Sequence, residues 1–102
     1  SDMDASFMVR LQKLRDAFGP MIITSAFRCE EHNAAIGGGP EHPIGKAADI
    51  AVDRQHARRM LTLAVGTFPR IGVSQRGASR FLHLGTAEPG EVNGASPMIW
   101  SY

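Results

Sequence analysis

Two histidines and one aspartate in this 102-residue sequence are of the residue types that hold a catalytic zinc ion. A short segment containing Gly45 separates His42 from Asp49, and His83 lies farther along the chain in an apolar run. Zinc binds neutral imidazole nitrogen and carboxylate oxygen, and three such ligands leave a fourth position for water. If the three side chains converge, they would form the site of a zinc hydrolase.

Each of these three residues also has an explanation that involves no metal. A lone histidine in an apolar strand, such as His83, is more often a hydrogen-bonded core residue, and His42 beside Pro43 could be an ordinary loop residue. Asp49 is harder to explain in this way, because small and apolar residues surround it and a buried carboxylate is costly without a partner. The residues alone therefore leave both interpretations open.

The spacing of apolar residues predicts the elements that must position these side chains. Helical spacing predicts a helix at about residues 4–18, a short helix at 30–36, and a third that begins after Asp53 as its N-cap. Strands are predicted at 21–24, 46–52, 70–74, 80–84 and 98–102, with a loop at 86–97. Trp100 and Tyr102 could pack on the sheet or line a groove, and we expect core packing for both. This order of elements favours an α+β domain with an antiparallel sheet.

Alternation within the strand at 46–52 places Asp49 on one face and Ile50 on the other. Asp49 can point to the same spot as His83 if the strands at 46–52 and 80–84 are neighbours. His42 would then reach in from the preceding loop, which turns at Gly45. The spacing does not itself establish that the strands pair.

Length and charge limit the classes of protein that this chain can represent. Its 102 residues suffice for one domain, at 1–102, and 43% hydrophobic residues allow a small core. A formal net charge of +1 argues against nucleic acid as the main partner. The basic cluster of Arg54, Arg58 and Arg59 is predicted to be a solvated helix face, and a nucleic-acid contact there is the weaker alternative.

Other features of the sequence concern its environment. Cys29 is the only cysteine, so no disulfide can form within the chain. No apolar stretch is long enough to span a membrane. The first four residues lack a basic region followed by an apolar one, and we therefore expect no secretory signal in this sequence. We expect a monomer.

Several motifs in order resemble the zinc D-Ala-D-Ala carboxypeptidase family, which also includes the L-alanyl-D-glutamate endopeptidases of phage lysins. The similar pieces cover residues 11–102, and they include Ser25, Arg28 and Asn33, the pair Gly37-Gly38, the motif His42-x-x-Gly45-x-Ala47-x-Asp49, the segment around His83, and Trp100-Ser101-Tyr102. The resemblance implies a Hedgehog/DD-peptidase-like α+β fold, in which helices flank a central antiparallel sheet.

The resemblance also implies a role for each matching residue. His42, Asp49 and His83 would hold Zn²⁺, and Arg28 would face the substrate, where a guanidinium can grip a carboxylate or a polarised carbonyl through paired hydrogen bonds. Ser25 would support the loop or the site rather than act as a nucleophile. The implied substrates are the peptide stems of peptidoglycan. The implied location is the bacterial cell envelope, or the cell wall to which a phage delivers the protein.

The sequence departs from the family pattern at three positions that bear on catalysis. Pro40 replaces a serine, Gly85 stands where many relatives carry an aspartate after His-x, and Arg80 stands where other branches carry an acid. No general base is therefore identified. The remaining candidates are Glu41, Asp53, Glu88 and Glu91. The alternative function is a non-catalytic zinc-binding module, of wall-binding or phage structural type, that has lost its general base.

Overall fold

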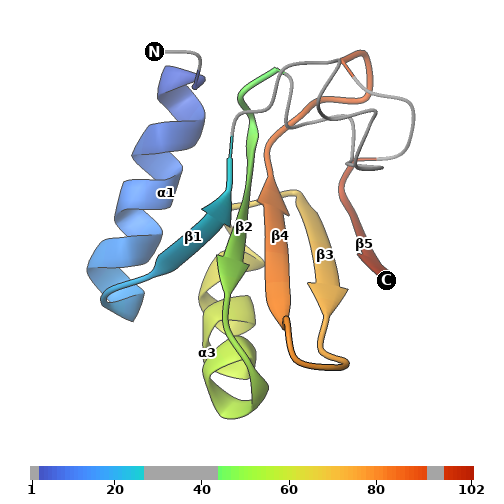
Figure 1. The fold of residues 1–102 in the computed structure, drawn as a ribbon. Helices are drawn as coiled ribbons and strands as arrows, with labels where there is room; N and C mark the ends of the chain where they lie inside the picture. The colour runs from blue at the N-terminus through green and yellow to red at the C-terminus, as the bar shows by residue number, and fades with distance from the viewer. Residues whose placement is uncertain (1–2, 27–43, 92–95) are drawn as a thin grey trace.

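A computed structural model describes residues 3–26, 44–91 and 96–102, which form two helices and a five-stranded sheet (Figure 1). This architecture confirms the predicted α+β class. The helix expected at 30–36 lies outside the described residues. In chain order the elements are α1 (Ala5–Phe18), β1 (Ile22–Ser25), β2 (Ala47–Ala51), α3 (Arg54–Ala64), β3 (Arg70–Ser74), β4 (Phe81–Gly85) and β5 (Met98–Ser101).

The strands are arranged in the order β1-β2-β4-β3-β5. The pairs β1–β2, β2–β4 and β4–β3 are antiparallel, as expected, but β5 runs parallel to β3. The predicted antiparallel sheet is thus confirmed for four of the strands, and β5 adds one parallel pairing at the edge. Gly85 at the end of β4 and Met98 at the start of β5 both pair with Arg70 at the start of β3, so β5 begins at the end of the sheet where β4 finishes and takes the direction of β3.

Helix α1 has clear signals at both of its ends. The Asp4 carboxylate accepts a hydrogen bond of 2.9 Å from the Phe7 N–H, which satisfies one of the free donors of the first turn. At the other end Gly19 adopts a φ of 108° and donates to the Arg15 carbonyl. Few residues other than glycine tolerate such a φ, and the helix therefore ends where the sequence predicts.

The hydrophobic core lies between the two described helices and one face of the sheet. Phe7 of α1 packs edge-to-face on Phe68 at a centroid distance of 5.9 Å, and Figure 1 shows α3 behind the sheet. The buried cluster comprises Phe7, Leu11, Leu14, Ala48, Ile50, Met60, Ala64, Phe68, Ile71, Leu82 and Leu84. Among the described residues, both helices thus cover the same face of the sheet.

Helix α3 begins at the predicted N-cap residue, but a different side chain makes the capping hydrogen bond. Asp53 occupies the N-cap position, but its side chain makes no capping hydrogen bond. The Arg54 N–H instead donates to Gln75 Oε1 at 3.1 Å, so the long Gln75 side chain provides the cap. Arg59 of this helix stacks on the Phe18 ring at 4.0 Å and donates to the Phe18 carbonyl, which ties α3 to the end of α1. Neither described helix is long and apolar enough to cross a membrane.

Candidate functional site

Asp49 and His83 lie side by side near the centre of the sheet, on the face opposite the core. They are register partners across the antiparallel pair β2–β4. His83 Nδ1 and Asp49 Oδ1 are 3.0 Å apart, and the two side chains are only 2% and 14% exposed. The strand pairing that the sequence left open is therefore present, and it brings two of the three predicted zinc ligands into contact.

The geometry of this contact fits two ligands of one zinc ion. Ligand atoms about 2.0–2.1 Å from a tetrahedral ion are separated from one another by about 3.3 Å. The observed Nδ1–Oδ1 distance of 3.0 Å is close to this value, so both atoms could share an ion after a small movement. The donor types also fit, since zinc binds imidazole nitrogen and carboxylate oxygen.

The third predicted ligand, His42, lies outside the described residues, together with Arg28 and Glu41. Across the parts of the chain that the structure describes, no three His, Cys, Asp or Glu side chains form a group that could hold a metal ion.

The turn at Gly45, which leads into β2, is held by a hydrogen bond to the segment before α1. Gly45 turns with a φ of 70°, and its carbonyl accepts a hydrogen bond from the Asp4 N–H beside α1. The predicted turn at Gly45 is confirmed.

A row of residues extends the site across the sheet on both sides of the pair. Ser25 on β1 is the register partner of Asp49, and Gly72 on β3 is the partner of His83. Trp100 on β5 is in turn the partner of Gly72, and its ring centroid lies 5.2 Å from that of His83. The sequence analysis missed this side of the site. No local signal was available for it, because alternation within a strand does not show which strands are neighbours.

The aromatic residues at the end of the chain do not join the core as expected. Trp100 is half-buried on the site face, and Tyr102 is 60% exposed. Both belong to a small cluster with Phe81, whose ring lies 5.2 Å from that of Tyr102. The prediction of core packing fails because β5 is an edge strand whose Trp100 faces away from α1 and α3.

A buried arginine lies two positions along β3 from Gly72, the register partner of His83. Arg70 on β3 is 5% exposed, its Nη1 lies 3.3 Å from Met98 Sδ, and its guanidinium carbon lies 5.2 Å from the Trp100 ring. Its register partner on β4 is Gly85. The guanidinium itself contacts residues of β5, which lies on the opposite side of β3 from Gly85.

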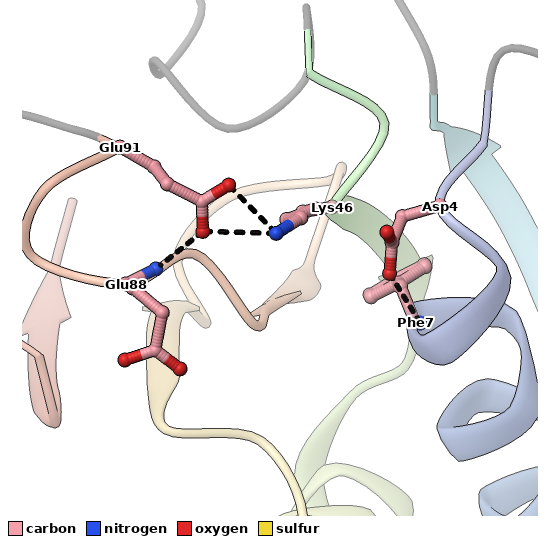
Figure 2. A network of polar contacts seen from close by, with 5 residues as sticks. All are labelled: Asp4, Phe7, Lys46, Glu88 and Glu91. Carbon is pink, nitrogen blue, oxygen red and sulfur yellow. Dashed lines mark hydrogen bonds and ion pairs between the residues drawn. The ribbon is translucent and has the colours of Figure 1, made fainter.

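Glu91, one of the candidate bases, is held by an ion pair with Lys46 (Figure 2). Its two carboxylate oxygens lie 2.9 and 2.6 Å from Lys46 Nζ, and one of them accepts the Glu88 N–H. The hydrogen bond from Lys46 holds the pKa of Glu91 below its usual value, and Glu91 correspondingly raises the pKa of Lys46. A carboxylate stabilised in this way is a weak proton acceptor, and Glu91 is a poor candidate for the base.

A groove opens beside Asp49 on the surface. Thr24 of β1 donates to the Asp49 carbonyl at 3.3 Å and lines one side of the groove. Ser79 and Arg80, which precede β4, line another side, and the Arg80 Nε donates to the Gly77 carbonyl. Asp49 is the member of the Asp49–His83 pair that lines the groove, so a polypeptide lying there would contact it.

A family model described as Peptidase M15 matches residues 2–85 of the chain. The chain belongs to the Peptidase M15 family. Members of this family are zinc peptidases in general, and the match includes Asp49, His83 and the stretch that contains His42. The M15 match ends at Gly85, so β5 and Trp100 lie beyond it. No curated protein and no solved structure matches the chain.

Proposed function

We propose that this M15 chain is a zinc-dependent metallopeptidase that hydrolyses the peptide stems of bacterial peptidoglycan, with His42, Asp49 and His83 as ligands. One observation carries the proposal, the 3.0 Å contact between His83 Nδ1 and Asp49 Oδ1 on adjacent strands. The M15 family supplies the reaction class. The choice of murein stems rests on the resemblance of the Arg28, His42 and Asp49 motifs to the carboxypeptidases and endopeptidases of cell walls.

In the proposed mechanism the chain provides a preformed ligand pair and a place for the peptide. When bound, zinc lowers the pKa of a water molecule to about 7 and polarises a carbonyl oxygen. The Asp49 carboxylate contributes negative charge, and the buried His83 ring presents Nδ1 on the same side. Arg28 would bind a carboxylate or carbonyl of the peptide. The groove beside Asp49 would hold the chain on either side of the scissile bond.

Proton transfer to the leaving amine requires an acid–base group, which contributes about 10²- to 10⁴-fold in rate. Glu91 is occupied by Lys46. Asp53 lies after β2, at the N-cap of α3, whereas the Gly45 turn of the ligand motif lies before β2. Asp53 is therefore at the opposite end of this strand from the turn, which makes it a poor candidate for the base. Glu41, next to His42, is the remaining candidate within the motif, and Glu88 is the alternative beyond it.

The decisive experiment combines metal analysis with murein digestion. Zinc-loaded protein should carry zinc after gel filtration and should release D-alanine or stem peptides from purified murein. The His83→Ala variant should lose both the metal and the release, because it removes one of the three proposed ligands. Zinc-loaded wild-type protein that retains no metal would overturn the proposal.

A second function is favoured by one specific observation, namely that Gly85 and Arg80 stand at the two positions near His83 where relatives carry an acidic residue. The domain would then bind zinc and cell wall without cutting it. Binding to murein with no hydrolysis at any pH would support this alternative, and measurable turnover would end it. A large gain of activity in Gly85→Asp would show that the natural site lacks its base.

A further inference from the structure

Trp100 reaches His83 across an intervening strand. Gly72 of β3 pairs with His83 on one side and with Trp100 on the other, so the three residues stand in one row on one face of the sheet. The indole lies over Gly72, and its ring centroid is 5.2 Å from that of the imidazole, with the ring planes at 53°. The indole thus contacts a predicted ligand although a strand separates the two residues.

Gly72 is needed for this contact because it leaves space. A Cβ atom at Gly72 would lie 2.7 Å from Trp100 Cε2 and 2.8 Å from Cζ2 and Nε1, distances that real Cβ atoms do not adopt. Gly72 is not among the described glycines with positive φ, which are Gly19, Gly45 and Gly77. Its backbone therefore does not require glycine, and a glycine within a strand costs about 0.5–1 kcal/mol relative to alanine. The position of the indole explains why glycine, and no larger residue, occupies position 72.

The indole is held by further contacts around it. The Arg70 guanidinium lies 5.2 Å from the Trp100 ring on the side of Met98, and the Tyr102 ring lies 6.3 Å away in an edge-to-face arrangement. Tyr102 is itself packed on Phe81 of β4. The His83 ring therefore lies between the Asp49 carboxylate and an indole that is itself packed against Arg70 and Tyr102.

We propose that Trp100 is a positioning residue that keeps the His83 imidazole in its metal-binding orientation. The inference rests on the proposed zinc site, but it concerns β5, which lies beyond the M15 match. An imidazole ring that can rotate loses conformational entropy when it binds a metal. An indole packed against the ring restricts this rotation before the metal binds, so the entropy loss on binding is smaller. Loss of a residue that orients a ligand lowers metal affinity by about 10- to 100-fold.

Four variants test the role of the indole. Trp100→Ala removes it, Gly72→Ala displaces it, and Trp100→Phe retains a smaller aromatic wall. Ile99→Ala is the matched control, since Ile99 is the next residue on β5 and its side chain is 61% exposed. The measurements are the Zn²⁺ and Co²⁺ dissociation constants by chelator competition, the visible absorption bands of bound Co²⁺, and circular dichroism to verify folding.

We expect Trp100→Ala and Gly72→Ala to weaken both metals by about 10- to 100-fold and to alter the Co²⁺ bands. Trp100→Phe should recover part of the affinity, and Ile99→Ala should match the wild type. Adding Gly72→Ala to Trp100→Ala should weaken binding no further, because Gly72 acts through the indole. Unchanged affinity and Co²⁺ bands in folded Trp100→Ala, or in folded Trp100→Phe if the alanine variant does not fold, would overturn the inference.

The wild-type protein supplies a measurement that is independent of any variant. Trp100 is the only tryptophan of the chain, so its fluorescence reports on this position alone. Paramagnetic Co²⁺ held by His83 should quench that fluorescence strongly, whereas Zn²⁺ should not. Metal binding without quenching by Co²⁺ would overturn the placement of Trp100 beside the site, whereas a wild-type protein that binds neither metal would instead overturn the proposed function.

Discussion

At the scale of single residues, the main feature is that a carboxylate in the middle of a buried strand has a specific partner. Asp49 is 14% exposed and lies against His83, which is only 2% exposed. Removing water from charged groups is costly, and the two side chains reduce that cost for each other. A shared metal ion would do so more completely, since it adds two positive charges to the site.

Replacing Asp49 by asparagine tests this residue without changing its size. We expect Asp49→Asn to weaken zinc binding by at least about 10-fold, because an amide oxygen carries no net charge and zinc prefers carboxylate oxygen. Zinc competition with a chelator is the measurement. Asp53→Asn is the control, since the Asp53 side chain makes no capping hydrogen bond, and it should bind zinc as the wild type does. Equal affinities for the two variants would contradict the assigned role of Asp49.

At the scale of elements, the segment after β4 is fastened to the beginning of β2, the strand that carries Asp49. The Thr86 N–H donates to the Lys46 carbonyl at 2.9 Å, and the Lys46–Glu91 ion pair closes the same connection a few residues later (Figure 2). The Glu91 side chain is partly exposed, so the pair should contribute only about 0.2–1 kcal/mol. Its effect on stability should depend on pH.

The direction of that dependence follows from the two pKa shifts. The pKa of Glu91 lies below its usual 4.5, so its contribution is present above that pH and is lost as the pH falls through the lowered value. The pKa of Lys46 is raised above 10.5, so its contribution is lost only at strongly alkaline pH. Glu91→Gln should therefore lower the free energy of unfolding at neutral pH by about 0.2–1 kcal/mol.

Urea denaturation of wild type and Glu91→Gln provides the measurement. The difference between them should shrink as the pH falls to about 3, where carboxylates become protonated. Glu88→Gln is a suitable control because the Glu88 carboxylate points away from the ion pair, while its backbone N–H donates to Glu91 (Figure 2). A difference that stays constant from neutral to acidic pH would show that the ion pair does not contribute.

The elements also show how far the sequence could be interpreted. Helix α1 and the strands around Asp49 and His83 were predictable because alternation and helical spacing are local signals. The parallel direction of β5 and the contact between Trp100 and His83 were not, since both depend on β3 lying between β4 and β5. Local patterns do not determine strand order, and the position of Trp100 follows from that order.

At the scale of the whole molecule, the site depends on a small core that supports one face of the sheet. Phe7 is fully buried against Phe68, and both belong to the cluster that joins the helices to β2 and β4. Truncating a buried phenylalanine to alanine costs about 3–5 kcal/mol. Total stabilities of such domains are about 5–15 kcal/mol, so the loss is a large share.

We therefore expect Phe7→Ala to lose about 3–5 kcal/mol of unfolding free energy. Val9→Ala, at a side chain that is 56% exposed on the same helix, should change it by less than about 0.5 kcal/mol. Denaturant unfolding of both variants is the measurement. Similar losses in the two variants would contradict the packing of α1 through Phe7.

The central claim is that Asp49 and His83 belong to one zinc site. The most direct test is the zinc content of protein loaded with zinc and then passed through a desalting column, measured for wild type and His83→Ala. We predict one zinc ion per chain in the wild type and almost none in the variant, with both proteins folded. Wild-type protein without zinc, or a folded His83→Ala variant that retains a full zinc ion, would contradict the claim.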